Sequence, residues 1–331
     1  MAVITSTNYW STVFDELQSE IERNGRAKYL YIAKRYDEVI RLIEDRIRAW
    51  YGRQALDNKI SLKQAYKKLP PEQLEMFKDL IATYLRDWRD ELGYEINERG
   101  QKVSLKDTTE SDVSEVQRLS DPSDWVMYLQ ECQNRDDITY YESLSVPILN
   151  EVEKVSHNTA ETLLFLLTVT GWAVHYDIAK NLKIQGLTQE AVKTELLKSW
   201  AKDNLNLYDR FNVNKAKLSA SVKTALIKGF RNEMSVDEVV AEVSKVMGVG
   251  AGAAKRLVLT ENSFFNTQAT YLALKEAGYT HYRYICRLLP TSCEDCIALH
   301  NTVFPIEVYE VGVTSPPQHP HCLCYIVGED N

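Results

Sequence analysis

The chain has 331 residues, of which 44% are hydrophobic and 26% are charged, a balance that excludes disorder over the whole length. A chain of this length can form two or three domains that each bury a core. The formal net charge is −8 and the pI is near 5.4. This acidity excludes the broad basic surface of a protein dedicated to wrapping nucleic acid, so we expect any contact with DNA to be local or through a partner.

The N-terminus, Met1 to Ser6, lacks the charged start and apolar run of a signal peptide, which predicts folding in a reducing cytosol. The most apolar stretch, residues 163–174, is about twelve residues long, fewer than the ~20 that cross a bilayer. We therefore expect a buried helix or strand there and no membrane partner.

Apolar side chains spaced by three or four residues predict a long amphipathic helix over residues 29–50. A second helix is expected to open at Pro70-Pro71, because proline is tolerated in a first turn, and to reach Trp88. The first hundred residues thus predict a helical hairpin or small bundle. The polar, turn-rich stretch 102–122 predicts a connector.

Helical spacing continues through the middle third, over residues 125–132, 148–179 and 188–200. Interruptions are expected at Pro147 and Gly186, because proline removes a helical hydrogen bond and glycine favours turns. The middle third is therefore also expected to be mostly helical.

Residues 235–238 predict a capping box, in which Ser235 and Glu238 bond each other's backbone amides, with the helix ending at Gly248. The glycine run 248–252 follows a helix and lacks the Walker lysine, so it predicts a helix-to-helix turn and not a dinucleotide loop. A further helix is expected from Ala253 to about Ala277, stopped by Gly278. Short apolar runs after residue 279 predict small strands.

No pattern of residues in the sequence indicates a catalytic centre. His175 with Asp177, and His157 with Glu161, are expected to be surface or capping arrangements, as is usual for a histidine near a carboxylate on a helix. Motifs for a serine or cysteine nucleophile are missing. We therefore expect a protein that is not an enzyme.

The C-terminal region carries paired cysteines at metal-chelating spacing. Cys293-x-x-Cys296 supplies two ligands, and the second pair is expected from His319, Cys322 and Cys324. The spacing leaves open which two of these three complete the shell. A disulfide pair or unligated thiols are the alternatives.

Two further cysteines and one histidine are weaker candidates. Cys132 and Cys286 are expected to be small packing residues, and His321 is a less favoured ligand. Because protein atoms alone can close a tetrahedral shell here, the pattern indicates a structural zinc site. Such an ion would stabilise a tail with few apolar residues.

The same residues give the chain its resemblance to a known family. Four strings carry it: 292–296 (Ser-Cys-Glu-Asp-Cys), 299–305 (Leu-His-Asn-Thr-Val-Phe-Pro), 316–320 (Pro-Pro-Gln-His-Pro) and 322–324 (Cys-Leu-Cys). With the upstream stretch 254–261, they resemble the phage minor head protein family, also called head-morphogenesis or Mu F-like proteins. The N-terminal Tyr9-Trp10 and the stretch 43–51 resemble minor capsid proteins of phages of Gram-positive hosts. The chain departs from the family pattern at Leu259, Leu289 and Leu323.

The resemblance implies a structural component of a tailed-phage virion, inside the capsid, with the host cytoplasm as its compartment during assembly. It implies association with the portal and other head proteins, weak contact with packaged DNA at most, and a role in head assembly and in genome packaging and ejection. The alternatives are a zinc-containing nucleic-acid-binding module and an enzyme, either a nuclease or an ADP-ribosyltransferase.

The predicted fold is mainly α, with an N-terminal and central helical bundle and a small zinc-stapled α+β module at the C-terminus. Its expected parts are an N-terminal bundle (1–101), a polar connector (102–122), a central helical region (123–234) and a minor-head domain (235–331) whose metal knot covers 286–326.

Overall fold

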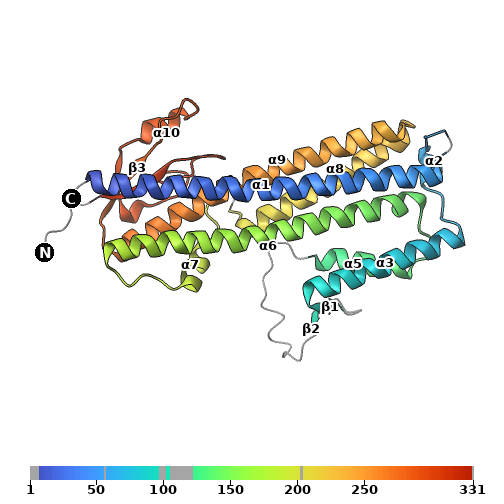
Figure 1. The fold of residues 1–331 in the computed structure, drawn as a ribbon, viewed down its shortest axis with the longest axis horizontal. Helices are drawn as coiled ribbons and strands as arrows, with labels where there is room; N and C mark the ends of the chain where they lie inside the picture. Colours follow the sequence, from blue (N-terminus) through green and yellow to red (C-terminus); the bar gives the residue numbers. More distant parts are fainter. Residues whose placement is uncertain (1–6, 56, 97–101, 105–121, 202–203, 330–331) are drawn as a thin grey trace. The chain divides into compact units, whose positions relative to one another are not determined.

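The computed structural model describes residues 7–55, 57–96, 102–104, 122–201 and 204–329 (Figure 1). It is mainly helical, with 71% of residues in helices and a small C-terminal sheet of three strands. The predicted fold class, mainly α with a C-terminal α+β part, is confirmed at this level. Most of the expected connector 102–122 lies outside the described residues.

The chain forms two compact units, each assembled from separate segments. The first unit comprises Met1–Ala33, Thr162–Arg210 and Gly252–Asn331, and the second comprises Lys34–Glu161 and Phe211–Ala251. The four-part division expected from the sequence stays a prediction.

In the second unit, α3 (Pro71–Leu92) and α5 (Ser123–Asn134) pack around a shared core that includes Trp88. The expected proline start of α3 is confirmed, and the helix ends at Gly93, whose φ of 71° suits glycine. The indole N–H groups of Trp88 and Trp125 both donate to Asn150 Oδ1, at 2.9 and 3.0 Å. This shared acceptor allows both tryptophans to lie in an apolar core without an unsatisfied donor.

The other local elements of this unit are short. A four-residue helix, α2 (Leu62–Ala65), begins with a capping box at Ser61. The strands β1 (Tyr94–Ile96) and β2 (Lys102–Ser104) form an antiparallel pair. The pair places a strand at the point where the sequence predicts the polar connector to begin.

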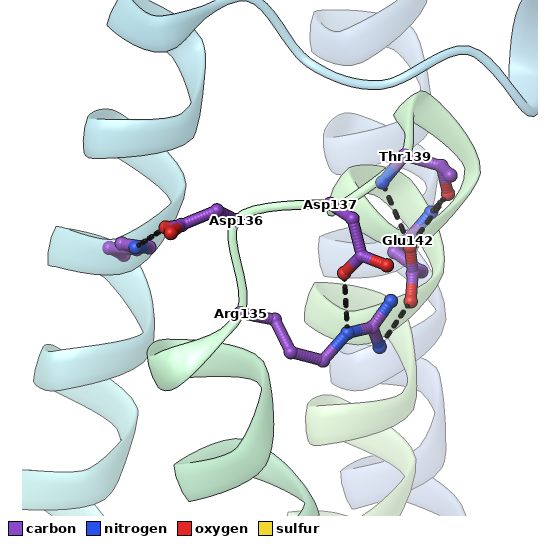
Figure 2. A network of polar contacts seen from close by, with 6 residues as sticks. Arg135, Asp136, Asp137, Thr139 and Glu142 are labelled. Atoms are coloured by element: carbon purple, nitrogen blue, oxygen red, sulfur yellow. Dashed lines mark hydrogen bonds and ion pairs between the residues drawn. The ribbon is translucent and has the colours of Figure 1, made fainter.

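Helix α6 (Tyr140–Leu182) starts at a polar network (Figure 2). The Thr139 N–H donates to Glu142 Oε2 at 2.8 Å, and the Glu142 N–H donates to Thr139 Oγ1 at 3.2 Å, which is a capping box. Arg135 donates to both Asp137 and Glu142, at 2.8 and 2.9 Å. The network therefore satisfies the backbone amides of Thr139 and Glu142 and holds the loop before α6.

The prediction of a helix break at Pro147 is wrong, because α6 runs through this residue. Proline in a helix costs about 3 kcal/mol through a lost hydrogen bond and a steric clash. All side chains from Leu144 to Leu149 are buried, and their burial outweighs that cost. The break expected at Gly186 falls in the loop after α6, which ends at Leu182, before α7 (Gln189–Leu196).

Helix α9 (Val236–Glu276) is also continuous, so the turn expected at Gly248 to Gly252 is wrong. Its capping box is confirmed, since the Ser235 N–H donates to Glu238 Oε2 at 2.8 Å. A Cβ on Gly250 would lie 2.8 Å from Leu218 of α8 (Leu207–Arg231), so glycine here permits close helix packing and does not mark a turn. The expected end is confirmed, because Gly278 has a φ of 81°.

Helix α1 (Thr7–Gln54) contains the predicted amphipathic helix 29–50 and extends beyond it in both directions. The apolar stretch 163–174 belongs to α6, where Leu163 and Leu167 are buried but Phe165 is 66% exposed. Over the described residues, α6 is the one helix whose length and mean hydropathy would allow it to cross a membrane. This test is also passed by core helices of soluble proteins, and 44% of the apolar window is buried.

The first unit contains the predicted C-terminal strands. Strand β3 (His281–Ile285) lies between β4 (Val303–Pro305) and β5 (Tyr325–Glu329), and both pairings are antiparallel. Side chains of this sheet pack on α6 and α9 in a cluster with these buried members: Val174, Ile178, Ala269, Ala273, Tyr325 and Val327. The short helix α10 (Glu294–Leu299) and the one-turn helix η1 (Ile306–Val308) connect the strands. This sheet and its connections carry the candidate site.

Candidate metal centre

The first two candidate ligands lie at the start of α10, beside the sheet (Figure 1). Cys293 is the N-cap of this helix, and its sulfur accepts a hydrogen bond of 3.3 Å from the Cys296 N–H. The extended backbone at Cys293 and the helical turn after it place the sulfurs of Cys293 and Cys296 on the same side of the start of α10. Cys296 is 1% exposed. A Cys-x-x-Cys pair at the start of a helix therefore forms a preorganised chelate.

The remaining candidates lie in the segment that leads into β5. It passes through Pro316-Pro317, whose peptide bond is cis, and then makes a tight turn in which the Cys322 N–H donates to the His319 carbonyl at 3.2 Å. Cys322 and Cys324 are 1% and 5% exposed. The turn and the strand bring these side chains to the buried Cys296.

The structure brings all five predicted ligands into one cluster, arranged as two overlapping groups. Within each group the ligand atoms lie within 4.8 Å of one another, and Cys296 belongs to both. The members of the first group are Cys293, Cys296 and His319, and those of the second are Cys296, Cys322 and Cys324. These groups are candidate metal-binding sites.

Two separations in the cluster match the geometry of a tetrahedral ion. Cys296 Sγ lies 3.5 Å from His319 Nε2 and 3.8 Å from Cys322 Sγ. Zinc bonds of about 2.3 Å to sulfur and about 2.0–2.1 Å to nitrogen place two sulfurs about 3.8 Å apart, and a sulfur and a nitrogen about 3.5 Å apart. The donor set, thiols with one imidazole, is also the one that zinc prefers. The residues present therefore fit a zinc ion.

His319 is held in the tautomer that a metal requires. Its Nδ1 lies 2.8 Å from the carbonyl oxygen of Pro320, so Nδ1 carries the proton and donates. The lone pair is then on Nε2, the atom that faces Cys296. Metal-bound histidines commonly use one ring nitrogen for the ion and the other for a backbone carbonyl.

The surroundings of the cluster favour a thiolate at one position. Hydrogen bonds from the Cys324 side chain and from backbone groups of Cys324 and Gln318 lower the pKa of Cys322. Burial raises the pKa of Cys296. Because thiolates are the metal-binding form of cysteine, the lowered pKa favours metal binding at Cys322, and a bound cation would favour deprotonation of the other thiols.

Tyr284 is a neighbour of the cluster that sequence reasoning missed. Its hydroxyl donates to Cys296 Sγ at 3.4 Å, and its side chain is fully buried in the central strand. Burial raises its pKa, so the phenol stays protonated and acts as a donor. The alternation of residues 281–285 indicates a strand, but only the fold shows that Tyr284 faces the sulfurs.

The other cysteines and His321 lie outside both groups. Cys132 is confirmed as a packing residue in the core of α3 and α5. Cys286 is buried in the same apolar cluster as Cys296, and its backbone N–H donates to His300 Nδ1 at 3.1 Å. His321 is exposed, and its backbone N–H donates to Thr260 Oγ1 at 3.4 Å.

Two histidines were expected in a surface or capping arrangement, and because both are buried, the surface expectation is wrong. His175 is 0% exposed, and its Nε2 accepts a hydrogen bond of 2.9 Å from the Leu187 N–H. Its Nδ1 lies 3.4 Å from the Ala269 carbonyl. His157 is 2% exposed and lies edge-on to Trp88. Both positions depend on tertiary neighbours that the local sequence does not reveal.

Comparisons of the chain with protein-family models, with curated protein sequences and with solved structures found no match.

Proposed function

We propose that the C-terminal cluster binds one zinc ion and that the ion has a structural role. The ligand side chains come from both ends of the small sheet region, before β4 and before β5. One ion would therefore join α10 to the segment that enters β5. Protein donors are numerous enough to fill a tetrahedral shell, which is typical of structural zinc sites; a catalytic site keeps a position for water.

We further propose that this chain is a structural minor head protein of a tailed phage. It would lie inside the capsid, associate with the portal and other head proteins, and support head assembly and genome packaging and ejection. The observation that carries this proposal is the clustering of the cysteines and the histidine through which the sequence resembles the phage family. Residues that form the resemblance are also those that meet in space.

The charge of the chain supports protein partners over DNA. The net charge is −8, and the segment around the cluster contributes carboxylates at Glu294, Asp295, Glu307 and Glu310. Nucleic-acid binding depends on cations that displace condensed counterions. An acidic surface therefore favours docking to other head proteins, with weak DNA contact at most.

Metal analysis of the purified protein tests the zinc proposal. We expect about one zinc per chain in the wild type, as for a single tetrahedral site, and none above background in Cys293→Ser. Cys132→Ser is the matched control, because its thiol lies in a different core. The proposal would be contradicted if the purified wild-type protein contained no metal above background.

A binding comparison tests the proposed partner. The purified chain is mixed with the portal protein of a tailed phage, and separately with duplex DNA, both at physiological salt. We expect retention on the portal protein and little retention on DNA. Tight DNA binding without portal binding would favour the nucleic-acid-binding alternative, and turnover of DNA or of NAD would favour an enzyme.

A further inference from the structure

The cluster offers five donors, one more than a tetrahedral ion can use. Cys296 belongs to both groups, so the choice concerns the remaining side chains. The assignment of four donors to the ion rests on the proposed zinc site.

Two tight turns present four of the donors as two pairs. In the first turn, the Cys293 sulfur accepts from the Cys296 N–H at 3.3 Å, and the Cys293 carbonyl accepts from the Ile297 N–H at 3.1 Å. In the second, the His319 carbonyl accepts from the Cys322 N–H at 3.2 Å. Each turn therefore holds two donors three residues apart, as chelating pairs require.

Cys296 of the first turn lies close to both donors of the second turn. Its sulfur lies 3.5 Å from His319 Nε2 and 3.8 Å from Cys322 Sγ, close to the edges of a zinc tetrahedron. His319 is fixed in the matching tautomer by the Pro320 carbonyl. Both donors of the second turn are thus placed around the sulfur of the first.

Cys324 differs from Cys322 in its surroundings. Cys322 belongs to the second turn, because its N–H donates to the His319 carbonyl at 3.2 Å. Cys324 lies beyond this turn, with its sulfur within 4.8 Å of those of Cys296 and Cys322. Cys324 directly precedes β5, whose first residue, Tyr325, pairs with Ile285. The strand therefore limits the movement of Cys324 towards the second turn.

We propose that the donors of the two turns form the complete zinc shell, as three thiolates and one imidazole: Cys293, Cys296, His319 and Cys322. Cys324 lies outside the shell and supports the Cys322 thiolate through a hydrogen bond. Outer hydrogen-bond partners of this kind tune metal affinity without changing the number of ions bound.

Zinc content and cobalt spectroscopy test this assignment. We expect Cys324→Ser to keep one zinc per chain, and Cys324→Ala to keep one zinc with an affinity about 10–100-fold weaker in a chelator competition. Cys322→Ser and His319→Ala should each lose stoichiometric zinc. Cys132→Ser again controls for the loss of a buried thiol elsewhere.

The cobalt-substituted wild type gives an independent measurement if a variant fails to fold. The sulfur-to-cobalt absorption should correspond to three thiolates, and four thiolates would overturn the assignment. Loss of zinc in Cys324→Ser with retention in Cys322→Ser or His319→Ala would also overturn it, while leaving the proposed zinc site in place. Wild-type protein that binds neither zinc nor cobalt would overturn both.

Discussion

The glycines of α9 differ in what surrounds them. A Cβ on Gly248 would meet no atom within 4 Å, whereas a Cβ on Gly250 would lie 2.8 Å from the side chain of Leu218. Glycine inside a helix is less favourable than alanine by roughly 0.5–1 kcal/mol, because it loses more backbone freedom on folding. The two positions should therefore respond differently to the same substitution.

Gly248→Ala should raise the free energy of unfolding by about 0.5–1 kcal/mol, because the added methyl group meets no obstacle and the backbone loses less entropy. Gly250→Ala should lower it, because Leu218 must move. Urea denaturation of both variants provides the measurement. Destabilisation by Gly248→Ala as large as that by Gly250→Ala would contradict this account of α9.

His175 gives a prediction for the pH dependence of stability. Burial lowers its pKa below the ordinary value of 6.5, although Glu276 nearby opposes the shift. Between the folded pKa and about 6.5, the unfolded chain binds more protons than the folded one, so stability falls as the pH falls. Protonation would also place a proton on Nε2, which accepts from Leu187.

We therefore expect the stability advantage of the wild type over His175→Gln to shrink as the pH is lowered from about 7.5 towards 5.5. Urea titrations across this range measure the difference, and loss of the proposed metal at low pH would affect both proteins alike. An NMR titration of the His175 ring adds a direct test. A pKa above 6.5 in the folded protein would contradict the prediction.

At the scale of elements, the start of α6 depends on side chains that satisfy its first amides. Thr139 and Glu142 bond each other's backbone N–H groups, and Arg135 adds a contact of 2.9 Å to Glu142 (Figure 2). The loop before the helix is tied to a second segment, because the Leu69 N–H donates to the Ile138 carbonyl at 2.8 Å. The cap thus orients the helix as well as stabilising its first turn.

Thr139→Ala should lower the free energy of unfolding by about 1 kcal/mol, because the Glu142 amide loses its partner. Thr139→Ser keeps the hydroxyl and should lower the free energy of unfolding much less. Thr83→Ala, at an exposed position inside α3, should change stability by less than about 0.5 kcal/mol. Equal effects of Thr139→Ala and Thr139→Ser in thermal unfolding would show that the hydroxyl is not responsible.

At the scale of the whole molecule, the two compact units differ in what stabilises them. The second unit has a core of large apolar side chains, with Trp88, Phe77 and Ile81 each less than 5% exposed. In the first unit, the C-terminal sheet has strands of three to five residues, and its connections carry the clustered cysteines. Elements this short have little area to bury, so metal ligation would add the missing folding energy.

Removal of the proposed metal should therefore act on one unit. We expect a strong chelator to speed hydrogen exchange at the amides of β3, β4, β5 and α10, and to leave α3 and α5 protected. Cys296→Ser should show the fast exchange without chelator and no further change with it. Uniform loss of protection along the chain would contradict a local role for the metal.

Features that depend on near neighbours in the chain can be predicted from the sequence. Proline at the start of α3, the Ser235–Glu238 cap and the glycine after α9 act within a turn of helix, and the structure confirms all of them. The chelating spacing of Cys293 and Cys296 is of the same kind, because three residues of one turn set the distance between the sulfurs.

Features that depend on contacts distant in sequence became visible in the fold. Pro147 and Gly250 lie inside continuous helices, because burial and close helix packing outweigh local propensity. Only the pairing of β3 with β5 brings Tyr284 to the sulfur cluster and the second turn to the first. Spacing along the chain could identify candidate metal donors. It could not predict which of their side chains lie within one group, because the sheet sets the relative positions of the separate turns.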